Sequence, residues 1–354
     1  MPGSGFTATV TTVASRIAVI EGDGIGREVI PAAIGVIKRL GLDLDFEHLD
    51  VNAERFLATG EALPAGAFGE LESADAILLG AIGDPRIRDP RYSGQSLGRI
   101  RRELDLYANV RPARLLDARL SPLRLPGAAQ AGVTIIRENT EGLYGSLGGR
   151  FKPGTQDETA LQEHISTYRG VRRILDYAFS AARSSVVMAD KWSAMPHAGA
   201  LWGRCWEEAT AAHPAVPARR VAIDACALHM IRDPGQFDVV VTENSFGDIL
   251  SDVAAALIGG VSFMPSANVN AASGRAMFEP VHGSAPDIAG SGTANPVAAV
   301  LACSLMLAHL GFPEEAAEVE TATAAAVRAG ECTPDGGGGL STAEAAAAIA
   351  RRLR

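Results

Sequence analysis

Apolar and polar residues form alternating blocks along the first hundred positions, and these blocks predict strands and helices in turn. Residues 16–20 are a short apolar run, and residues 27–40 place apolar side chains at helical spacing. The succession continues with a strand over 44–50, a helix over 53–60 and a strand over 74–83. Such alternation predicts a parallel sheet covered by helices, which is an α/β architecture.

The middle of the chain follows a different pattern. Strand-like runs over 106–116, 132–145 and 159–169 come one after another before a helical pattern over 170–183. This predicts a second, mixed region between two helix-rich parts. An apolar run over 297–310 is shorter than a membrane span and therefore predicts a buried helix.

Composition narrows the class of protein. The chain has 354 residues, of which 47% are hydrophobic and 21% charged, so it can bury a large core over about two domains. A net charge of −9 disfavours nucleic acid and anionic membrane surfaces as partners. The four cysteines are far apart in the sequence, which fits free thiols in a reducing cytoplasm better than disulfides or zinc. We expect residues 1–15 to be a disordered leader, because they lack the basic and apolar regions of a signal peptide.

A glycine-rich turn follows the first predicted strand. Gly22, Gly24 and Gly26 approximate the dinucleotide-binding pattern Gly-x-Gly-x-x-Gly, but Arg27 occupies the position of the third glycine. Asp50 lies about where that pattern places its ribose-binding acid. Two interpretations stay open at this point: a cofactor site at the turn, or a glycine turn with another purpose.

Two aspartates stand at the start of a later helical pattern. Asp248 and Asp252 are four residues apart, so their carboxylates project from one face of the helix and repel each other. Acids also favour the first turn of a helix, which is the alternative explanation for each residue alone. As a pair they are candidate oxygen ligands for Mg²⁺ or Mn²⁺.

Three arginines lie within or beside strand-like runs. Arg101, Arg111 and Arg137 occupy positions where a structural ion pair is the ordinary explanation for any one of them. Together they favour an anionic substrate.

A further irregular stretch, residues 278–296, is rich in glycine and proline and precedes the apolar helix. Its length favours a functional loop, such as one that holds a nucleotide.

These stretches also resemble a known family. The segments GDGIGREV, LDLYANVRP, RENTEGLYG, DILSDVAAAL and FEPVHGSAPDIAG occur in the order seen in β-decarboxylating dehydrogenases, which act on 3-isopropylmalate, isocitrate, homoisocitrate or tartrate. The resemblance runs from about residue 16 to residue 339. It implies the isopropylmalate dehydrogenase-like α/β fold, with two domains around a central cleft, and not a Rossmann fold. The expected large, cofactor-side domain is 16–106 with 259–354, and the expected small domain is 107–258.

The resemblance also implies a reaction and its residues. Family members oxidise the hydroxyl of a 3-substituted malate with NAD(P)⁺, release CO₂ and protonate the resulting enolate. Arg101, Arg111 and Arg137 match the carboxylate clamp, Lys191 the general base and Tyr144 the acid that protonates the enolate. Asp224, Asp248 and Asp252 match the set that binds Mg²⁺ or Mn²⁺.

In the family the cofactor lies against the loop after residue 278, so the glycine turn is expected to be a tight turn facing the cleft. The expected cofactor-binding residues are Glu279, His282, Gly283, Ala285, Asp287 and Asn295. A carboxylate at Asp287 accepts hydrogen bonds from ribose hydroxyls and repels a 2′-phosphate, which favours NAD⁺ over NADP⁺. The resemblance further implies a homodimer in which Lys191 and Asp224 reach into the partner's active site.

The helix before Arg101 departs from the family pattern. Isopropylmalate dehydrogenases carry two leucines where this chain has Leu97 and Gly98, and isocitrate dehydrogenases carry serine and asparagine at the positions of Gln95 and Leu97. Extra arginines crowd this segment, at positions 86, 88, 91, 99 and 102. We therefore expect Leu97 and Arg99 or a neighbour to contact the C3 substituent, which is anionic in isocitrate, homoisocitrate or a phosphonomethylmalate. A solvated basic loop is the alternative.

Two other functions stay open on the sequence. One is a non-catalytic regulatory subunit of the same family, and the other is a simple NAD-dependent hydroxyacid dehydrogenase that uses the glycine turn. The presence of Tyr144, Lys191 and all three aspartates favours an active enzyme over the regulatory subunit. Trp192 and Ser193 replace the usual Ala-Asn after the lysine, which affects the contacts expected beside the nicotinamide.

Overall fold

The computed structural model describes residues 14–123, 132–145 and 147–354. Most of the expected leader lies outside these residues. Ser15 is already the first residue of a strand, and its backbone N–H donates to the carbonyl oxygen of Asp43 at 3.1 Å. The boundary expected after residue 15 is therefore one residue too late.

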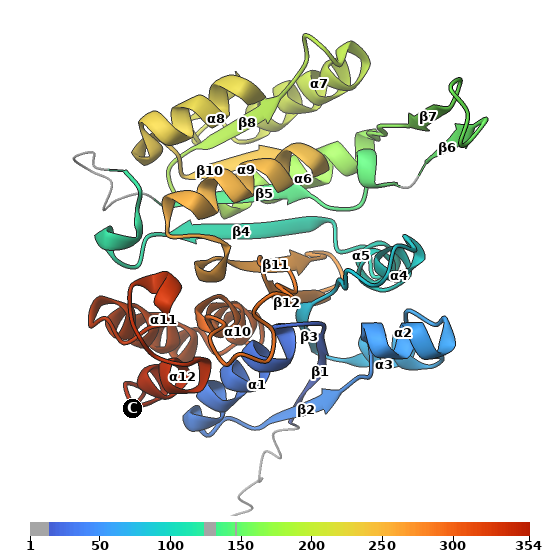
Figure 1. Cartoon of the computed structure of the whole chain (residues 1–354). Helices are drawn as coiled ribbons and strands as arrows, with labels where there is room; N and C mark the ends of the chain where they lie inside the picture. The colour runs from blue at the N-terminus through green and yellow to red at the C-terminus, as the bar shows by residue number, and fades with distance from the viewer. Residues whose placement is uncertain (1–13, 124–131, 146) are drawn as a thin grey trace, which may run out of the picture.

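One large sheet runs through the molecule, with ten strands in the order β2-β1-β3-β12-β11-β4-β5-β10-β8-β9 (Figure 1). Its strands are β1 (Ser15–Gly22), β2 (Leu44–His48), β3 (Ala76–Ala81), β4 (Ala108–Arg114), β5 (Gly132–Glu138), β8 (Val186–Asp190), β9 (Ala218–Ala222), β10 (Val239–Thr242), β11 (Pro265–Val269) and β12 (Ala276–Pro280). β11 pairs antiparallel with β12 and β4, and β4 pairs antiparallel with β5, whereas the other pairs are parallel. This mixed order differs from a Rossmann sheet, as expected.

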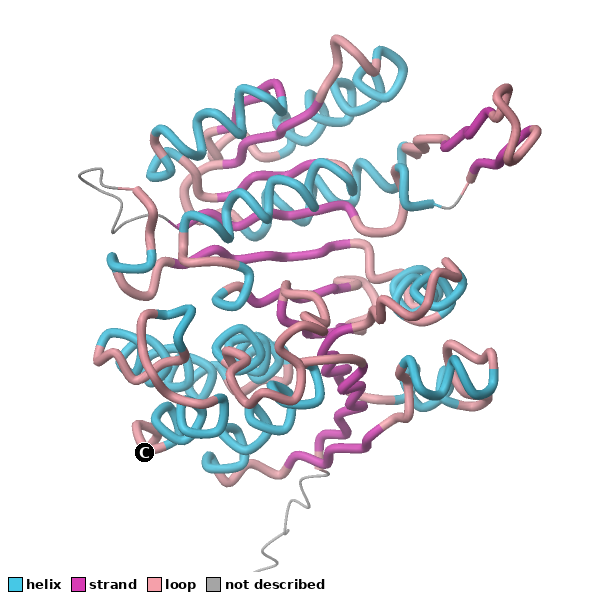
Figure 2. The backbone as a smooth tube through the Cα atoms, in the orientation of Figure 1, coloured by secondary structure: helices cyan, strands magenta, loops and turns pink. Residues whose placement is uncertain are grey.

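Helices cover both faces of the sheet (Figure 2). They are α1 (Gly26–Ile37), α2 (Ala53–Thr59), α3 (Ala67–Ser73), α4 (Arg91–Gln95), α5 (Leu97–Glu103), α6 (Tyr168–Ala181), α7 (Pro196–Ala212), α8 (Ile223–Arg232), α9 (Asn244–Leu257), α10 (Val297–His309), α11 (Pro313–Arg328) and α12 (Thr342–Ala350). The buried helix expected over 297–310 is α10, which packs against α1, α11 and the strands β11 and β12. Because α10 is apolar on all sides, it is stable only when surrounded by other elements.

A two-stranded hairpin protrudes from the body of the molecule (Figure 1). It consists of β6 (Gly148–Phe151) and β7 (Thr159–Gln162), whose residues are all exposed. The strand expected over 159–169 is therefore wrong beyond Gln162. Thr167 ends the extended segment by accepting the backbone N–H of Gly170 through its side chain, and this cap starts α6.

The segments expected to form two domains meet in the middle of the sheet. Strand β11 belongs to the expected large domain and β4 to the expected small domain, and the two are paired from Ala267↔Val110 to Val269↔Ala108. The sheet is continuous across this junction, and the division into two domains stays a prediction. Within the described residues, no helix is long and apolar enough to cross a membrane.

Candidate active site

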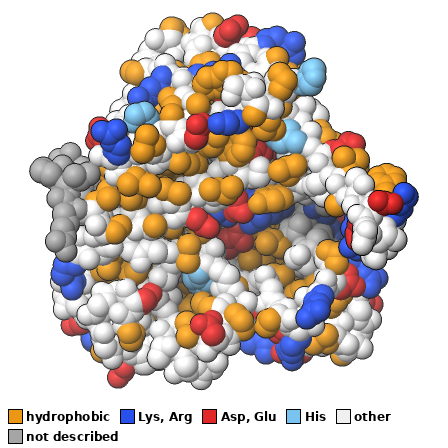
Figure 3. Space-filling view, turned by 45° about the horizontal axis from the view of Figure 1, so that its top comes forward, with side chains coloured by type: hydrophobic (Ala, Val, Ile, Leu, Met, Phe, Trp, Pro, Cys, Tyr) orange, Lys and Arg blue, Asp and Glu red, His pale blue; other side chains and the backbone are white. Residues whose placement is uncertain are grey.

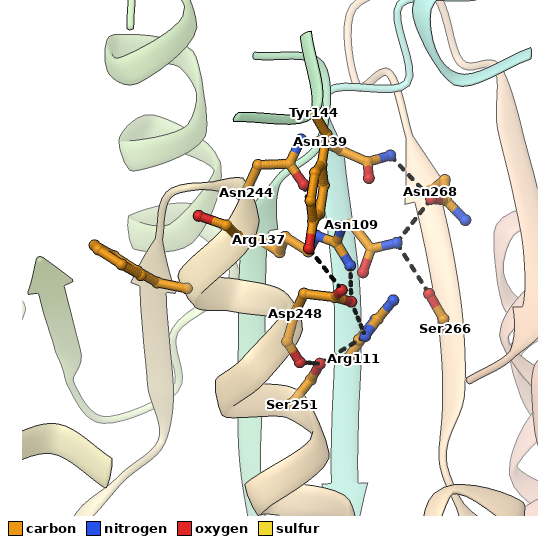
Figure 4. A network of polar contacts seen from close by, with 12 residues as sticks. Asn109, Arg111, Arg137, Asn139, Tyr144, Asn244, Asp248, Ser251, Ser266 and Asn268 are labelled. Carbon is orange, nitrogen blue, oxygen red and sulfur yellow. Dashed lines mark hydrogen bonds and ion pairs between the residues drawn. The ribbon is translucent and has the colours of Figure 1, made fainter. Parts of the chain in front are cut away.

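Three charged side chains from different elements meet at the centre of the sheet (Figure 4). Arg111 lies on β4, Arg137 on β5 and Asp248 on the second turn of α9. Arg111 Nη1 lies 3.3 Å from Asp248 Oδ1, and Arg137 Nη1 donates to the same oxygen. The chain thus brings together two of the predicted clamp arginines and one predicted metal ligand.

Burial makes the charges of this cluster interdependent. The Arg137 side chain is only 3% exposed, and its burial, together with the positive charges of Arg111 and Arg101, lowers its pKa to about 9. The guanidinium nevertheless stays charged at neutral pH. Burial alone would raise the pKa of Asp248, but the charges of Arg137 and Arg111 outweigh burial and lower it, so this carboxylate is ionised.

Arg101, the third predicted clamp residue, has a different partner. It lies on α5, and its Nη2 donates to Glu279 Oε1 on β12 at 2.6 Å. Glu279 is buried, and the charge of Arg101 keeps its pKa low against the effect of burial. Glu279 was expected to bind the cofactor, and the structure places it against the clamp.

Tyr144 extends from the short turn after β5 towards the same aspartate. Its hydroxyl donates to Asp248 Oδ2 at 3.2 Å, and the Arg137 guanidinium lies 5.4 Å from the centre of its ring. Partial burial and the negative charge of Asp248 raise the pKa of Tyr144. The hydroxyl therefore carries a proton at neutral pH, as a group that donates a proton must.

Asp252 lies one turn after Asp248 on α9. Burial, and then the charge of Asp248, raise its pKa, which is the physical sign of two carboxylates that repel each other. A bound cation would relieve this repulsion, so the pair fits a divalent metal ion. No group of three metal-binding side chains occurs among the described residues of this single chain.

Lys191 and Asp224 form a separate pair. Lys191 follows strand β8, and its Nζ donates to Asp224 Oδ1 on the first turn of α8 at 2.9 Å. This hydrogen bond lowers the pKa of Asp224. The following residue, Trp192, is covered by the Arg220 guanidinium at 4.8 Å from its ring centre. In the described part of one chain, the predicted metal ligand Asp224 is thus paired with the predicted base and does not join the other aspartates.

The loop after β12 carries most of the predicted cofactor residues. His282 is buried, and its Nδ1 donates to the carbonyl oxygen of Gly283 at 2.9 Å, which leaves Nε2 as an acceptor. Burial lowers the pKa of His282, so the ring is neutral near pH 7. Nε2 has no hydrogen-bond partner among the described residues. Ala285 adopts a φ of 39°, and Asp287 is exposed.

Two side chains fix this loop to its surroundings. Glu28 on α1 accepts the backbone N–H groups of Gly290 and Gly292, and Asn295 accepts that of Val297 at the start of α10. Asn295 also donates to Asp335 at 3.1 Å. A cavity of about 410 Å³ opens between this loop and the glycine turn, and it is lined in part by Gly24, Pro286 and Gly290.

The glycine turn packs directly against the cofactor loop. Gly24 has a φ of 52°, and a Cβ atom there would lie 1.9 Å from the carbonyl oxygen of Ser284. The same oxygen accepts the N–H of Ile25 at 2.9 Å, and the N–H of Gly26 is bonded to Asp23. The amides at this helix start are therefore already used, which argues against a phosphate site in the turn.

The predicted contacts to the C3 substituent lie on α5. Leu97 packs partly buried against the apolar cluster that contains Ile100 and Leu104. Arg99 is paired with Glu103 at 2.8 Å, and its guanidinium lies over the Phe68 ring. The structure therefore does not bring Arg99 to the Arg111–Asp248 cluster.

Several polar residues of the site have no counterpart in the sequence predictions. Asn109, Asn139, Ser266 and Asn268 form a buried hydrogen-bonded network beside the arginines (Figure 4). Their sequence signal is a polar residue at every second position of otherwise apolar strands, as at 109 and 111 or 266 and 268.

Figure 3 shows a hollow near the middle of one face of the molecule, in which acidic and basic side chains gather.

A mixed α/β sheet with buried arginines and acids at its centre is typical of an enzyme site for an anionic ligand. The model of a family described as isocitrate/isopropylmalate dehydrogenase matches residues 16–349. A 3-isopropylmalate dehydrogenase from Rhodococcus erythropolis is 44% identical over 336 residues, which are 93% of this chain and 97% of that protein. The enzyme of the same name from Mycobacterium tuberculosis H37Rv is 43% identical over 314 residues, covering 88% of this chain and 93% of that one.

Solved structures agree with this match. The isocitrate dehydrogenase of Methylococcus capsulatus superposes with a TM-score of 0.88 at 33% identity, covering 96% of this chain and 99% of that one. A β-decarboxylating dehydrogenase from Thermococcus kodakarensis, in its apo form, gives 0.79 at 33% identity and 96% coverage of both chains. The chain belongs to the isocitrate/isopropylmalate dehydrogenase family, as the sequence motifs indicated, and is an oxidoreductase of that family.

Proposed function

We propose that this protein catalyses the NAD-dependent oxidative decarboxylation of a 3-substituted malate. The observation that carries the proposal is the meeting of Arg111, Arg137, Asp248 and Tyr144 at one point of the sheet. Two buried guanidinium groups bind carboxylates, and a protonated tyrosine beside them supplies the acid that the reaction requires. The names of the relatives, 3-isopropylmalate dehydrogenase and isocitrate dehydrogenase, support a substrate of this class.

The acidic pair on α9 supports a Mg²⁺ or Mn²⁺ requirement. Asp248 and Asp252 would hold the ion, and Asp224 would complete the set. When bound, such an ion polarises the hydroxyl and carboxylate of the substrate and stabilises negative charge on oxygen. In the structure Asp248 neutralises the arginines, and a cation on Asp248 would release part of their charge for the substrate carboxylates.

Each remaining residue has one task in this proposal. Arg101, Arg111 and Arg137 orient the carboxylates of the substrate, and Lys191 removes the proton of its hydroxyl. After CO₂ has left, the Tyr144 hydroxyl donates its proton to the enolate carbon. The raised pKa of Tyr144 is consistent with this order, because the proton stays on the oxygen until a strong base forms beside it.

The cofactor is proposed to be NAD⁺, bound along the loop after β12. Nε2 of His282, a buried acceptor in this loop, suits the amino group of an adenine. Gly283, Ala285 and Asn295 shape the loop, and the exposed Asp287 would accept hydrogen bonds from the ribose.

We further propose a homodimer with shared active sites. The hairpin β6–β7 stands away from the body, exposes Phe151 at 62% and Leu161 at 48%, and has outer strand edges that pair with no other described strand. Such edges pair readily with another chain. The side chains of Lys191 and Asp224 are 34% and 68% exposed, so a second chain can contact them. Within the described part of one chain they do not form a metal-binding group with Asp248 and Asp252, as expected if Asp224 serves the partner's metal site.

The C3 substituent is proposed to be anionic. Arg99 is engaged by Glu103, but its neighbour Arg102 has no ion pair among the described residues. The Arg102 guanidinium donates to the carbonyl oxygen of Gly94 at 3.0 Å. Its Nη1 atom lies 2.9 Å from the position that a Cβ atom on residue 98 would take. Gly98 thus gives Arg102 space that the second leucine of isopropylmalate dehydrogenases would fill.

A substrate panel tests the proposal. NADH formation and CO₂ release are measured with NAD⁺ and Mn²⁺ on 3-isopropylmalate, isocitrate, homoisocitrate, tartrate, malate and 3-phosphonomethylmalate. We expect CO₂ and NADH in equal amounts from one of the three panel members with an anionic C3 substituent, which are isocitrate, homoisocitrate and 3-phosphonomethylmalate. Faster turnover of 3-isopropylmalate would contradict the anionic C3 substituent alone, and no turnover of any member would contradict the proposed reaction.

A further inference from the structure

A buried asparagine lies at the centre of the polar network between the two halves of the sheet. Asn268 on β11 is the cross-strand partner of Asn109 on β4, and it is fully buried. Its Oδ1 accepts from Asn109 Nδ2 at 2.7 Å and from Asn139 Nδ2 at 2.9 Å. Its Nδ2 donates to Glu279 Oε1 at 2.8 Å, and that same oxygen accepts from Arg101.

These contacts fix the orientation of the amide. If the Asn268 amide were turned over, its nitrogen would face two amide donors and its oxygen would face the Glu279 carboxylate. Each of these three hydrogen bonds would then become a repulsive contact, and so would a fourth, which Asn268 Nδ2 donates to the carbonyl oxygen of Met277 at 3.3 Å. Asn268 therefore has one stable orientation, which is set by residues on β4, at the end of β5 and on β12.

We propose that Asn268 is a positioning residue that holds Arg101 in the substrate clamp through Glu279. Arg101 comes from α5, whereas Arg111 and Arg137 come from β4 and β5 on the other side of the β11–β4 junction. The chain of hydrogen bonds from Asn109 through Asn268 to Glu279 crosses this junction and sets the distance between Arg101 and the other two arginines. This inference rests on the proposed function, because the clamp is defined by its carboxylate substrate.

Asn268 acts by fixing the position of one carboxylate oxygen of Glu279. Glu279 Oε1 receives both the Asn268 amide and the Arg101 guanidinium, so the amide decides where that oxygen lies. Without the amide, the buried Glu279 side chain keeps, within the described part of the chain, only its hydrogen bond from Arg101, and it rotates with that arginine. Substrate carboxylates would then meet one misplaced arginine, which weakens substrate binding more than cofactor binding.

The test compares Asn268→Ala with Asn270→Ala in the full-length protein. Asn270 is also buried, but among the described residues its side chain accepts only from the backbone N–H groups of Ala272 and Ser273 in the turn after β11. Kinetics are measured with the panel substrate that the unmodified enzyme oxidises fastest. We expect kcat/KM for this substrate to fall about 10- to 100-fold in Asn268→Ala, while KM for NAD⁺ changes less than about twofold. Asn270→Ala should differ from the unmodified enzyme by less than about twofold.

Asn268→Asp separates positioning from a loss of folding. Its carboxylate still accepts from Asn109 and Asn139 but repels Glu279, and the charged groups facing the pair are Arg101 and Arg111. At lower pH the two carboxyl groups share a proton, and a hydrogen bond to Glu279 forms again. We expect kcat/KM relative to the unmodified enzyme to recover by at least about fivefold as the pH is lowered over the range in which both proteins stay folded.

The outcomes are distinguishable. If the unmodified enzyme oxidises no panel member, the proposed function fails and this inference fails with it. If the enzyme is active but Asn268→Ala behaves like Asn270→Ala, only the positioning role is overturned. Equal increases in KM for substrate and NAD⁺, or an Asn268→Asp variant without recovery at lower pH, would also overturn the positioning role, because general loosening of the fold predicts both.

Discussion

The two aspartates on α9 differ in their charge environment although they are one helical turn apart. Arg137 and Arg111 keep the pKa of Asp248 low, whereas burial and Asp248 raise the pKa of Asp252. A carboxyl group whose pKa is higher in the folded than in the unfolded protein stabilises the fold when protonated. That contribution is present at low pH and is lost as the pH rises through the folded pKa.

We therefore expect Asp252 to destabilise the metal-free protein slightly at neutral pH. We expect Asp252→Asn to raise the free energy of unfolding by about 1 kcal/mol or less at pH 7, with the gain disappearing below about pH 4. Mn²⁺ should stabilise the unmodified protein by about 1.4 kcal/mol at ten times its Kd and should not stabilise the variant. Chemical denaturation with and without Mn²⁺ measures both effects, with Asp43→Asn, an exposed aspartate elsewhere, as control. Equal stabilisation of the variant by Mn²⁺ would rule out Asp252 as a ligand.

At the level of single residues, the sequence predicted the charged groups of the site better than the neutral ones. Arg111, Arg137 and Asp248 were predicted because a charge in an apolar strand or at a helix start calls for a partner, and the structure brings these three together. Asn268 was not predicted. An asparagine that bridges two strands depends on the strand register, which a single sequence does not contain.

The glycine turn and the cofactor loop behave as one structural unit. Gly24 has a φ of 52°, and a methyl group there would collide with the Ser284 carbonyl. We expect Gly24→Ala to destabilise the protein by about 2–4 kcal/mol and to raise KM for NAD⁺ more than KM for the hydroxy acid. The loop must move away from the turn, and the predicted cofactor residues lie on that loop.

The control for this variant is Gly35→Ala on α1, where nothing lies within 4 Å of a new Cβ atom. There alanine should stabilise the helix by about 0.5–1 kcal/mol. Thermal unfolding and steady-state kinetics of the two variants provide the comparison. An unchanged KM for NAD⁺ in a folded Gly24→Ala protein would contradict the dependence of the cofactor loop on the turn.

Among the elements, long amphipathic or apolar segments were predicted well and short ones were not. The strands of the first hundred residues, α6 and α10 agree with their hydrophobic patterns. The seven-residue α3 was missed, and the one helix expected before Arg101 is divided at Ser96 into the short helices α4 and α5. Helices of this length are not stable by themselves and form because neighbouring elements cover them, as Phe56 covers the Tyr92 ring of α4.

At the scale of the whole molecule, the hydrophobic pattern predicted an α/β sheet and strand-like runs at β4 and β5, but it predicted neither β11 nor the antiparallel pairings at the centre of the sheet. Strands β4, β5 and β11 pair antiparallel and join the two halves, and this joining places Arg101 across from Arg111. Pairings between segments separated by more than a hundred residues depend on loop closure and on packing over the entire chain. The motifs supplied the family, and through it the fold, where the hydrophobic pattern alone did not.

The assembly of active sites from two chains can be tested by mixing variants. Lys191→Ala and Asp252→Asn each remove one partly exposed side chain, so both variants should fold and both should be inactive. If Lys191 serves the partner's site, a mixed dimer contains one site with both substitutions and one site with none. Mixing equal amounts after unfolding and refolding should therefore restore about a quarter of the original activity, because about half of the dimers are mixed.

The same experiment distinguishes the alternative arrangement. If Lys191 and Asp252 served the same site within one chain, every site in every mixed dimer would lack one of them, and mixing would restore no activity.

A variant with Phe151→Glu and Leu161→Glu on the hairpin tests the same assembly in a second way. These charges should hinder association through the exposed hairpin, so sedimentation should show more monomer and activity should rise with protein concentration. Full activity of a monomeric form would exclude shared sites.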